Sequence, residues 1–104
     1  MEKHDVILET TAVSDLHSIL DYISDVLKEP KAAQRIFSTI EEKILSLDEL
    51  PHRQSIVKDE PYKSIGLRWL PIESYTAFYV IDEERREVRV LRILYNRRNW
   101  QAIL

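Results

Sequence analysis

The residues with the clearest capacity for chemistry lie in the C-terminal third of the chain, where an apolar stretch leads into a basic and aromatic segment. Val88–Tyr95 is rich in β-branched and apolar residues and predicts a β-strand. Arg97 and Arg98 follow directly, with Trp100 close behind. Guanidinium groups held at the end of a rigid strand, beside aromatic rings, can bind phosphate or carboxylate groups. The pattern predicts a site for an anionic partner here.

The composition is that of a single small domain without metal or thiol chemistry. The chain has 104 residues, of which 44 % are hydrophobic, so residues 1–104 can form one domain with a modest core. The sequence contains no cysteine, and His4, His17 and His52 lack the spacing of metal ligands. We therefore expect no metal and no cofactor.

The chain carries neither of the sequence signals that direct a protein to or across a membrane. No apolar run approaches the roughly 20 residues that a membrane-spanning helix needs. The N-terminal residues lack the basic and then apolar pattern of a signal peptide. We therefore expect a cytoplasmic protein with no membrane association.

Charge is distributed unevenly between the two halves of the chain. Residues 1–57 carry six Lys or Arg and eleven Asp or Glu, whereas residues 58–104 carry nine and seven. The net charge of −3 is unlike the strongly basic character of most nucleic-acid-binding domains. The basic half can nevertheless hold a local site for an anion, and ordinary surface charge explains the asymmetry equally well.

Two amphipathic helices are predicted in the acidic half. The first spans about residues 11–28 after an N-cap at Thr10 or Thr11, and the second spans about residues 31–49, with Pro30 near its first turn. Two such helices joined by a few residues predict a helical hairpin. The expected buried stripes are Ala12, Leu16, Ile19, Ile23 and Leu27 in the first helix and Ala33, Ile36, Ile40, Ile44 and Leu47 in the second.

Strand-like segments flank this hairpin. Val6–Leu8 precedes it, and Ile65–Leu70, interrupted at Pro71, Tyr75–Ile81 and Val88–Tyr95 follow it. The order predicts an α+β fold with an N-terminal strand, an α-helical hairpin packed on one sheet face, and a three-stranded antiparallel meander. Strict alternation divides the last strand into one face with Val88, Val90, Arg92 and Leu94 and another with Arg89, Leu91, Ile93 and Tyr95.

Alternation in the second meander strand predicts how the sheet meets the hairpin. Alternate residues of Tyr75–Ile81 should face the helices, so Phe78 or Tyr79 should be buried with Ile36 or Ile40. Helices on opposite faces of the sheet would contradict this arrangement.

A series of short motifs, in order along nearly the whole chain, resembles the RelE/ParE superfamily of bacterial toxins. Thr11–Ile19 is similar to the family's T-x-x-A-x-x-D-L-x-x-I, with one fewer residue between Thr and Ala. Arg68–Leu70 resembles its R-x-L strand and Tyr75–Tyr79 its Y-x-x-x-Y strand. Arg92–Trp100 resembles R-V-L-H-x-x-R-D-W. The resemblance implies the toxin of a type II toxin–antitoxin system, which a cognate antitoxin neutralises in a hetero-oligomeric complex.

Within this superfamily the ParE branch, which poisons DNA gyrase and needs no catalytic set of its own, is the closer match. The RelE branch cleaves messenger RNA on the ribosome with cationic and proton-transfer groups. At positions that match such groups, this chain has Ser64, Gly66 and Thr76. The resemblance therefore implies DNA gyrase as the target.

Two alternatives remain open beside the gyrase poison. One is a RelE-like, ribosome-dependent mRNA endonuclease, an endoribonuclease for which Arg92, Tyr95 and Arg97 are the candidate catalytic residues. The other is a degenerate, non-toxic protein that keeps only the antitoxin interface.

The resemblance and the residue chemistry together nominate two groups of binding residues. The candidate target-binding residues are Arg68, Tyr95, Arg97, Arg98 and Trp100. Structural roles compete with four of the functional assignments. Arg68 could pair with an acid across the sheet, and Arg92 could pair at the end of a core-facing row. Tyr95 could pack in the core or at the sheet edge, and Trp100 could plug the end of the sheet. Tyr22 and Leu45, which a helical wheel places away from the core stripes, are the candidate antitoxin-binding residues.

Overall fold

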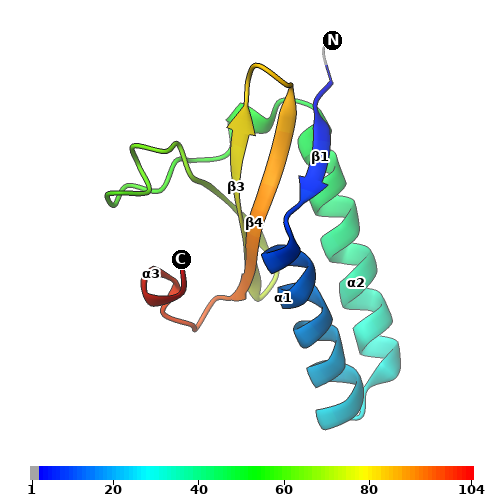
Figure 1. Ribbon diagram of the computed structural model, residues 1–104. Helices are drawn as coiled ribbons and strands as arrows, with labels where there is room; N and C mark the ends of the chain where they lie inside the picture. The colour runs from blue at the N-terminus through cyan, green and yellow to red at the C-terminus, as the bar shows by residue number, and fades with distance from the viewer. Residues whose placement is uncertain (1–2) are drawn as a thin grey trace.

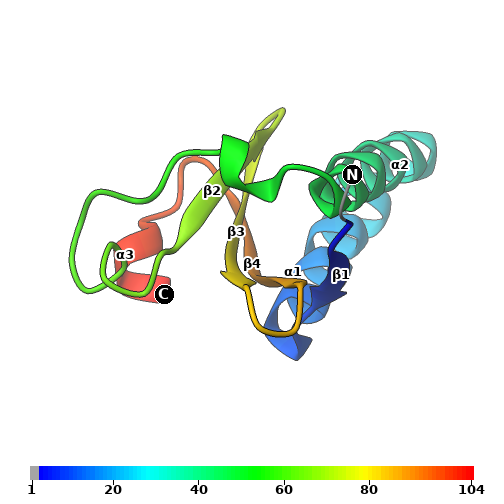
Figure 2. The same cartoon turned by 90° about the horizontal axis from the view of Figure 1, so that it is seen from above.

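Two long helices pack on one face of a four-stranded sheet in the computed structural model, which describes residues 3–104 (Figures 1 and 2). The N-terminal half contributes the first strand and both helices, and the C-terminal half contributes the other strands and a short last helix. The elements, in order, are β1 (Asp5–Leu8), α1 (Thr10–Asp21), the π-helical turn η1 (Tyr22–Val26), α2 (Pro30–Leu45), the 3-10 turns η2 (Ser46–Asp48) and η3 (Pro51–Arg53), β2 (Arg68–Ile72), β3 (Tyr75–Asp82), β4 (Glu87–Tyr95) and α3 (Trp100–Ile103).

The sheet has the strand order β1-β4-β3-β2. β2, β3 and β4 form the predicted antiparallel meander, and β1 pairs in parallel with β4. The long connection makes this parallel pairing possible, because the hairpin and β2–β3 lie between β1 and β4 along the chain. The predicted α+β fold class is confirmed, and the sheet is mixed.

The apolar stripe of the second helix is buried as predicted. Ala33, Ile36, Ile40, Ile44 and Leu47 all lie in the core, together with Tyr79 of β3. Phe78 faces the opposite side of the sheet, in a second cluster that α3 covers with Trp100 and Ile103. The prediction that one of these two aromatic residues joins Ile36 and Ile40 is therefore confirmed for Tyr79.

The first helix departs from expectation at both ends. Its N-cap is Glu9, which makes no side-chain capping bond, and Thr11 instead lies inside the helix. At the C-terminal end the turn widens into the π-helical η1, so the core stripe ends at Ile23. Leu27, which the wheel placed on the buried stripe, is 51 % exposed because the π turn shifts the residues after it around the helix axis.

A β-bulge in β4 overturns the predicted division of its faces. Tyr79 pairs with Val90 and Phe78 with Arg92, so Leu91 is an extra residue on β4. The extra residue restarts the alternation, and Ile93 joins Val88 and Val90 in the cluster beneath the helices. Leu91 and Leu94 belong to the opposite cluster.

The strand predicted as Ile65–Leu70 instead runs from Arg68 to Ile72. Gly66 adopts φ +72° in the turn before it, and a Cβ atom at this position would meet nothing within 4 Å, so backbone conformation rather than close packing favours glycine there. Pro71 lies within β2 because the strand is at the sheet edge. The Trp69 N–H points away from β3 and donates to the Ser55 carbonyl (3.2 Å). The Pro71 nitrogen, two residues later, points the same way, so its lack of an N–H removes no hydrogen bond between β2 and β3.

The Tyr79 hydroxyl links the sheet to the segment after α2. It donates a 2.6 Å hydrogen bond to the Pro51 carbonyl, and the residue is fully buried. Burial raises the pKa of Tyr79 to about 12, although Arg68 and Arg53 pull it down in part. The folded protein therefore holds this proton between pH 10 and 12, whereas the unfolded chain releases it.

We predict that Tyr79→Phe lowers the free energy of unfolding by about 1 kcal/mol at neutral pH, because the Pro51 carbonyl loses its donor. As pH rises from 10 towards 12, the free energy of unfolding of the wild-type protein should fall, because the unfolded chain releases the Tyr79 proton more readily than the folded protein does. The variant lacks this proton, so its free energy of unfolding should fall less. Urea unfolding of both proteins at pH 8 and pH 11 measures the difference. Identical pH dependence in the two proteins would contradict this role.

Candidate functional site

Helix α1 holds the bulged segment of β4 through three polar contacts. The Thr11 hydroxyl donates to the carbonyl of the extra residue Leu91 (2.6 Å), and the Asp15 carboxylate accepts the Ile93 N–H (3.0 Å). Arg92 completes the arrangement by donating to both Asp15 oxygens, at 2.7 and 2.8 Å. The backbone groups that the bulge removes from the ladder are thus satisfied by α1.

Arg92 is committed to this arrangement. Its side chain is 24 % exposed and that of Asp15 is 14 % exposed, and the hydrogen bond to Asp15 raises the pKa of Arg92. The expected pairing of Arg92 is therefore confirmed, although the predicted core-facing row is wrong. A guanidinium group whose Nε–Nη2 edge is held by a carboxylate, and whose Nη1 donates to the Ile103 carbonyl (3.4 Å), is poorly placed to bind a phosphate. The catalytic role of Arg92 in the nuclease alternative stays a prediction.

Asn96 fixes the direction in which the chain leaves β4. Its N–H donates to the Ser74 carbonyl (2.9 Å), and its side-chain amide donates to the Glu73 carbonyl (3.3 Å). Its amide oxygen accepts a 2.6 Å hydrogen bond from the Thr76 hydroxyl. The start of the C-terminal segment is therefore fastened to the β2–β3 turn.

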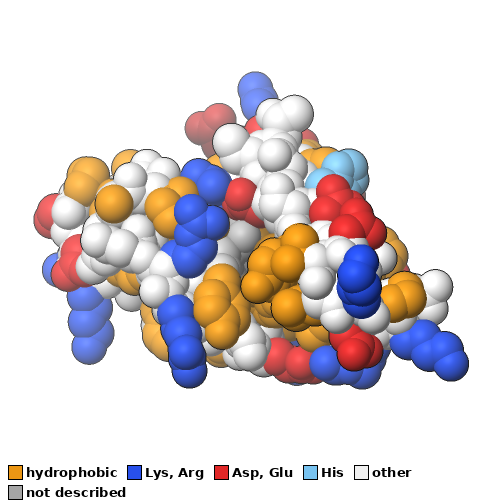
Figure 3. All heavy atoms as spheres, turned by 90° about the horizontal axis from the view of Figure 1, so that it is seen from below, with side chains coloured by type: hydrophobic (Ala, Val, Ile, Leu, Met, Phe, Trp, Pro, Cys, Tyr) orange, Lys and Arg blue, Asp and Glu red, His pale blue; other side chains and the backbone are white. Residues whose placement is uncertain are grey.

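Arg97 and Arg98 leave this anchored point with free side chains. Both residues are exposed, and within residues 3–104 neither guanidinium group makes a hydrogen bond or an ion pair. Only the Arg98 backbone is bonded, through its N–H to the Tyr95 carbonyl (3.0 Å). Figure 3 shows the underside of the molecule, where Lys and Arg side chains stand out beside hydrophobic ones. The predicted cationic pair is available to an anionic partner.

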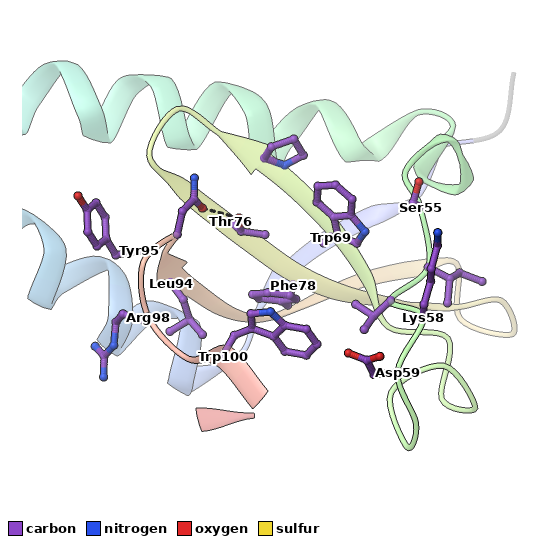
Figure 4. A pocket seen from close by; sticks show the side chains of 14 residues that line it. Ser55, Lys58, Asp59, Trp69, Thr76, Phe78, Leu94, Tyr95, Arg98 and Trp100 are labelled. Atoms are coloured by element: carbon purple, nitrogen blue, oxygen red, sulfur yellow. Dashed lines mark hydrogen bonds between the residues drawn. The ribbon is translucent and has the colours of Figure 1, made fainter. Parts of the chain in front are cut away.

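An aromatic groove of about 690 Å³ lies on the sheet face opposite the hairpin (Figure 4). Val57, Phe78 and Leu94 are its buried residues, while Trp69 and Tyr95 are about 40 % exposed on its two sides. Lys58 and Arg98 are its basic residues. The lining brings together the predicted target-binding residues Tyr95, Arg98 and Trp100. Sequence reasoning missed Trp69 and Lys58, because nothing local to them indicates that segment 55–59 folds beside β2.

Trp100 closes one side of this groove as an apolar plug. Its ring lies against Phe78, with centroids 5.4 Å apart, and against Tyr62 at 5.5 Å. The Tyr62 hydroxyl also donates to the Gln101 carbonyl (3.2 Å), which fastens α3 to the loop before β2. The structural interpretation of Trp100 is therefore supported, and a target contact by its exposed edge stays a prediction.

One interpretation expected Arg68 to pair with an acid, but within residues 3–104 its side chain bonds to backbone carbonyls instead. Its Nη1 donates to the backbone carbonyls of His52 (3.1 Å) and Gln54 (2.6 Å). The guanidinium group thereby holds the segment after η3 against the start of β2. It does not line the aromatic groove, so its role in target binding stays a prediction.

A second groove, of about 820 Å³, separates the hairpin from the lower ends of β3 and β4. This hairpin groove is lined by both apolar and polar side chains, and Tyr22, 54 % exposed, is one of them. Its helical wall includes Ile19, Tyr22, Ile23, Leu27, Ala32 and Ile36, and its sheet wall includes Tyr75, Ile93, Leu94, Tyr95 and Arg98.

The two candidate antitoxin-binding residues are not brought together. Leu45 is exposed as predicted, but it lies at the C-terminal end of α2, far from the α1–α2 connection that Tyr22 precedes (Figure 1). Tyr75 was missed as a groove residue. Burial first, and then Tyr95 and Glu73, raise the pKa of Tyr75. The Y-x-x-x-Y pattern was the only sequence signal that marked it.

Residues 3–104 offer neither a metal-binding cluster nor a membrane-spanning helix. They contain no group of three or more His, Cys, Asp or Glu side chains arranged to hold a metal ion. No helix in that range is long and apolar enough to cross a membrane.

Comparison with known protein families gives the class of protein to which this fold belongs. The sequence profile of one family, described as the ParE toxin of type II toxin–antitoxin systems, parDE, matches residues 6–100. The chain belongs to this ParE toxin family. No curated protein sequence matches it significantly.

Solved structures of toxin–antitoxin systems share the fold. A structure of the chromosomal ParDE system from P. aeruginosa aligns with a TM-score of 0.73 and 24 % identity, covering 89 % of this chain and 96 % of that one. The RelBE2 complex from Mycobacterium tuberculosis aligns with a TM-score of 0.68 and 27 % identity, covering 91 % and 93 %. The archaeal RelE–RelB complex from Pyrococcus horikoshii aligns with a TM-score of 0.57 and 18 % identity, covering 92 % and 98 %.

We predict that Asp15→Ala lowers the free energy of unfolding by about 2 kcal/mol or more, because it leaves Arg92 and the Ile93 N–H without a partner. Asp21→Ala is the matched control, since Asp21 is exposed at the end of the same helix, and it should change stability by no more than about 0.5 kcal/mol. Chemical denaturation measures both. Equal stability of the two variants would show that the bulge does not depend on Asp15.

Proposed function

We propose that this ParE-family toxin inhibits growth by poisoning DNA gyrase through its C-terminal arginine pair. The observation that carries the proposal is the placement of Arg97 and Arg98, which are exposed, unpaired within residues 3–104 and fixed in direction by Asn96. A surface with two free guanidinium groups beside an aromatic groove can bind carboxylates or phosphates of a large partner without performing chemistry. The proposed target places the protein in the cytoplasm.

The positions that would serve an mRNA endonuclease are poorly equipped for that reaction. Ser64 and Gly66 lie in the turn before β2 rather than on the sheet. The Thr76 hydroxyl already donates a hydrogen bond to the Asn96 side chain. Arg92 is held by Asp15. Tyr95 and Arg97 are left as the candidate groups, and phosphoryl-transfer catalysis depends heavily on several preorganised charged donors. This supports an inhibitor that acts by binding.

We also propose that a cognate antitoxin occupies the hairpin groove. The ParDE, RelBE2 and RelE–RelB structures that share this fold come from toxin–antitoxin systems. Apolar side chains of both walls are accessible in this groove, and Tyr22 and Leu27 are each more than half exposed. Burial of such surfaces against a partner is favourable by roughly 25 cal/mol per Å². Leu45 is proposed as a second, separate contact near the other end of α2.

We predict that replacing Arg97 and Arg98 together with alanine abolishes growth inhibition in cells, because the target loses both cationic contacts. The fold should persist, since exposed substitutions usually change stability by no more than about 0.5 kcal/mol. The control is Lys31→Ala with Arg85→Ala, which removes the same charge from other exposed positions. Growth after induction and circular dichroism measure the two effects. Full toxicity of the arginine double variant would exclude this site.

We further predict that the purified wild-type chain blocks DNA supercoiling by gyrase and leaves messenger RNA intact, with or without ribosomes. The nuclease alternative makes the opposite prediction, and Tyr95→Phe or Arg97→Ala should then abolish transcript cleavage. A chain that does neither, yet still binds its antitoxin, would support the degenerate, non-toxic alternative. Supercoiling gels and primer extension on translated transcripts distinguish these outcomes.

A further inference from the structure

Arg98 lies on a ridge that belongs to both grooves. Only Leu94, Tyr95 and Arg98 line the aromatic groove and the hairpin groove alike, and Leu94 is buried between them. Arg97 lines neither groove. In Figure 4, Tyr95 and Arg98 stand at one end of the aromatic groove, away from Lys58 and Ser55 at the other. A partner that fills the hairpin groove therefore reaches one member of the arginine pair and not necessarily the other.

The charges that line the hairpin groove are balanced except at this ridge. Asp15 is engaged by Arg92, and Arg35 donates to both oxygens of Glu73 at 3.1 and 3.2 Å. Arg98 is the remaining charged residue of the lining, and its guanidinium group makes no hydrogen bond or ion pair within residues 3–104. The groove thus offers apolar side chains, internally paired charges and one unmatched positive charge at its edge. Its complement is an apolar segment that carries a carboxylate at the corresponding position.

We propose that the antitoxin silences the toxin by pairing an acidic side chain with Arg98 while its apolar residues fill the hairpin groove. This inference rests on the proposed function, since it assigns the antitoxin and the target to the same guanidinium group. One guanidinium cannot present the same edges to two carboxylates or phosphates at once, so antitoxin and target exclude each other. Neutralisation is then direct competition at the ridge rather than a distant change in shape.

The two arginines provide a matched comparison, because they are adjacent, exposed and equal in charge. The probe is the protein encoded by the small reading frame that neighbours this toxin's own, titrated against wild-type toxin at 50 and 300 mM NaCl. We expect Arg98→Ala to weaken binding about tenfold at the lower salt and to reduce its salt dependence. We expect Arg97→Ala to change binding no more than about twofold, and Arg98→Lys to recover part of the loss. Equal effects of the two alanine variants would overturn the proposal.

A second measurement tests the competition itself. Gyrase, wild-type toxin and the neighbouring frame's product are mixed and separated by size. If antitoxin and gyrase compete for Arg98, gyrase–toxin and toxin–antitoxin complexes should form, but no complex of all three proteins. A stable complex of all three would overturn the proposed competition. The antitoxin titration does not depend on gyrase. Loss of binding in Arg98→Ala together with no gyrase inhibition by wild-type toxin would therefore disprove the target while upholding the acidic contact.

Discussion

The arrangement of this protein depends on the way α1 satisfies the bulged backbone of β4. Leu91 is an extra residue in the strand, and its carbonyl would be left without a partner if Thr11 did not donate to it. Asp15 then binds both the Ile93 N–H and Arg92. These contacts make the bulge tolerable, and the bulge sends Ile93 into the core beneath the helices and Leu94 to the opposite face. The bulge at Leu91 therefore sets the direction in which the side chains of the last β4 residues point.

Three other arginine side chains make contacts inside the protein, whereas those of Arg97 and Arg98 make none within residues 3–104. Arg68 is bonded to backbone carbonyls, Arg92 to Asp15, and Arg35 to Glu73. Each of these side chains stabilises a junction between segments that are distant in sequence. Arg97 and Arg98 have no such task within residues 3–104, while Asn96 anchors the backbone just before them. Because Asn96 anchors the backbone, a partner that binds this pair would fix the two side chains but little of the main chain, which limits the conformational entropy lost on binding.

Periodicity was enough to predict the hairpin, the meander and the buried stripe of α2, because each depends on a repeating pattern within one element. The π turn and the β4 bulge could not be predicted in the same way. An extra residue such as Leu91 looks like any other apolar residue of a strand, and only its contact with Thr11 marks it. The exposed arginines were visible in the sequence, but the two grooves that meet at Arg98 depend on segments far apart along the chain, such as Tyr22, Trp69 and Tyr75.

The proposed contact between the segment after β4 and DNA gyrase is tested most directly by site-specific crosslinking. A photo-reactive amino acid at position 99 would lie next to both arginines while leaving them intact, since Asn99 is exposed and makes no side-chain capping bond. In cells that express the toxin without antitoxin, illumination should link the chain to a gyrase subunit, and the link should disappear when Arg97 and Arg98 are replaced with alanine. Crosslinks confined to ribosomal components would contradict the account.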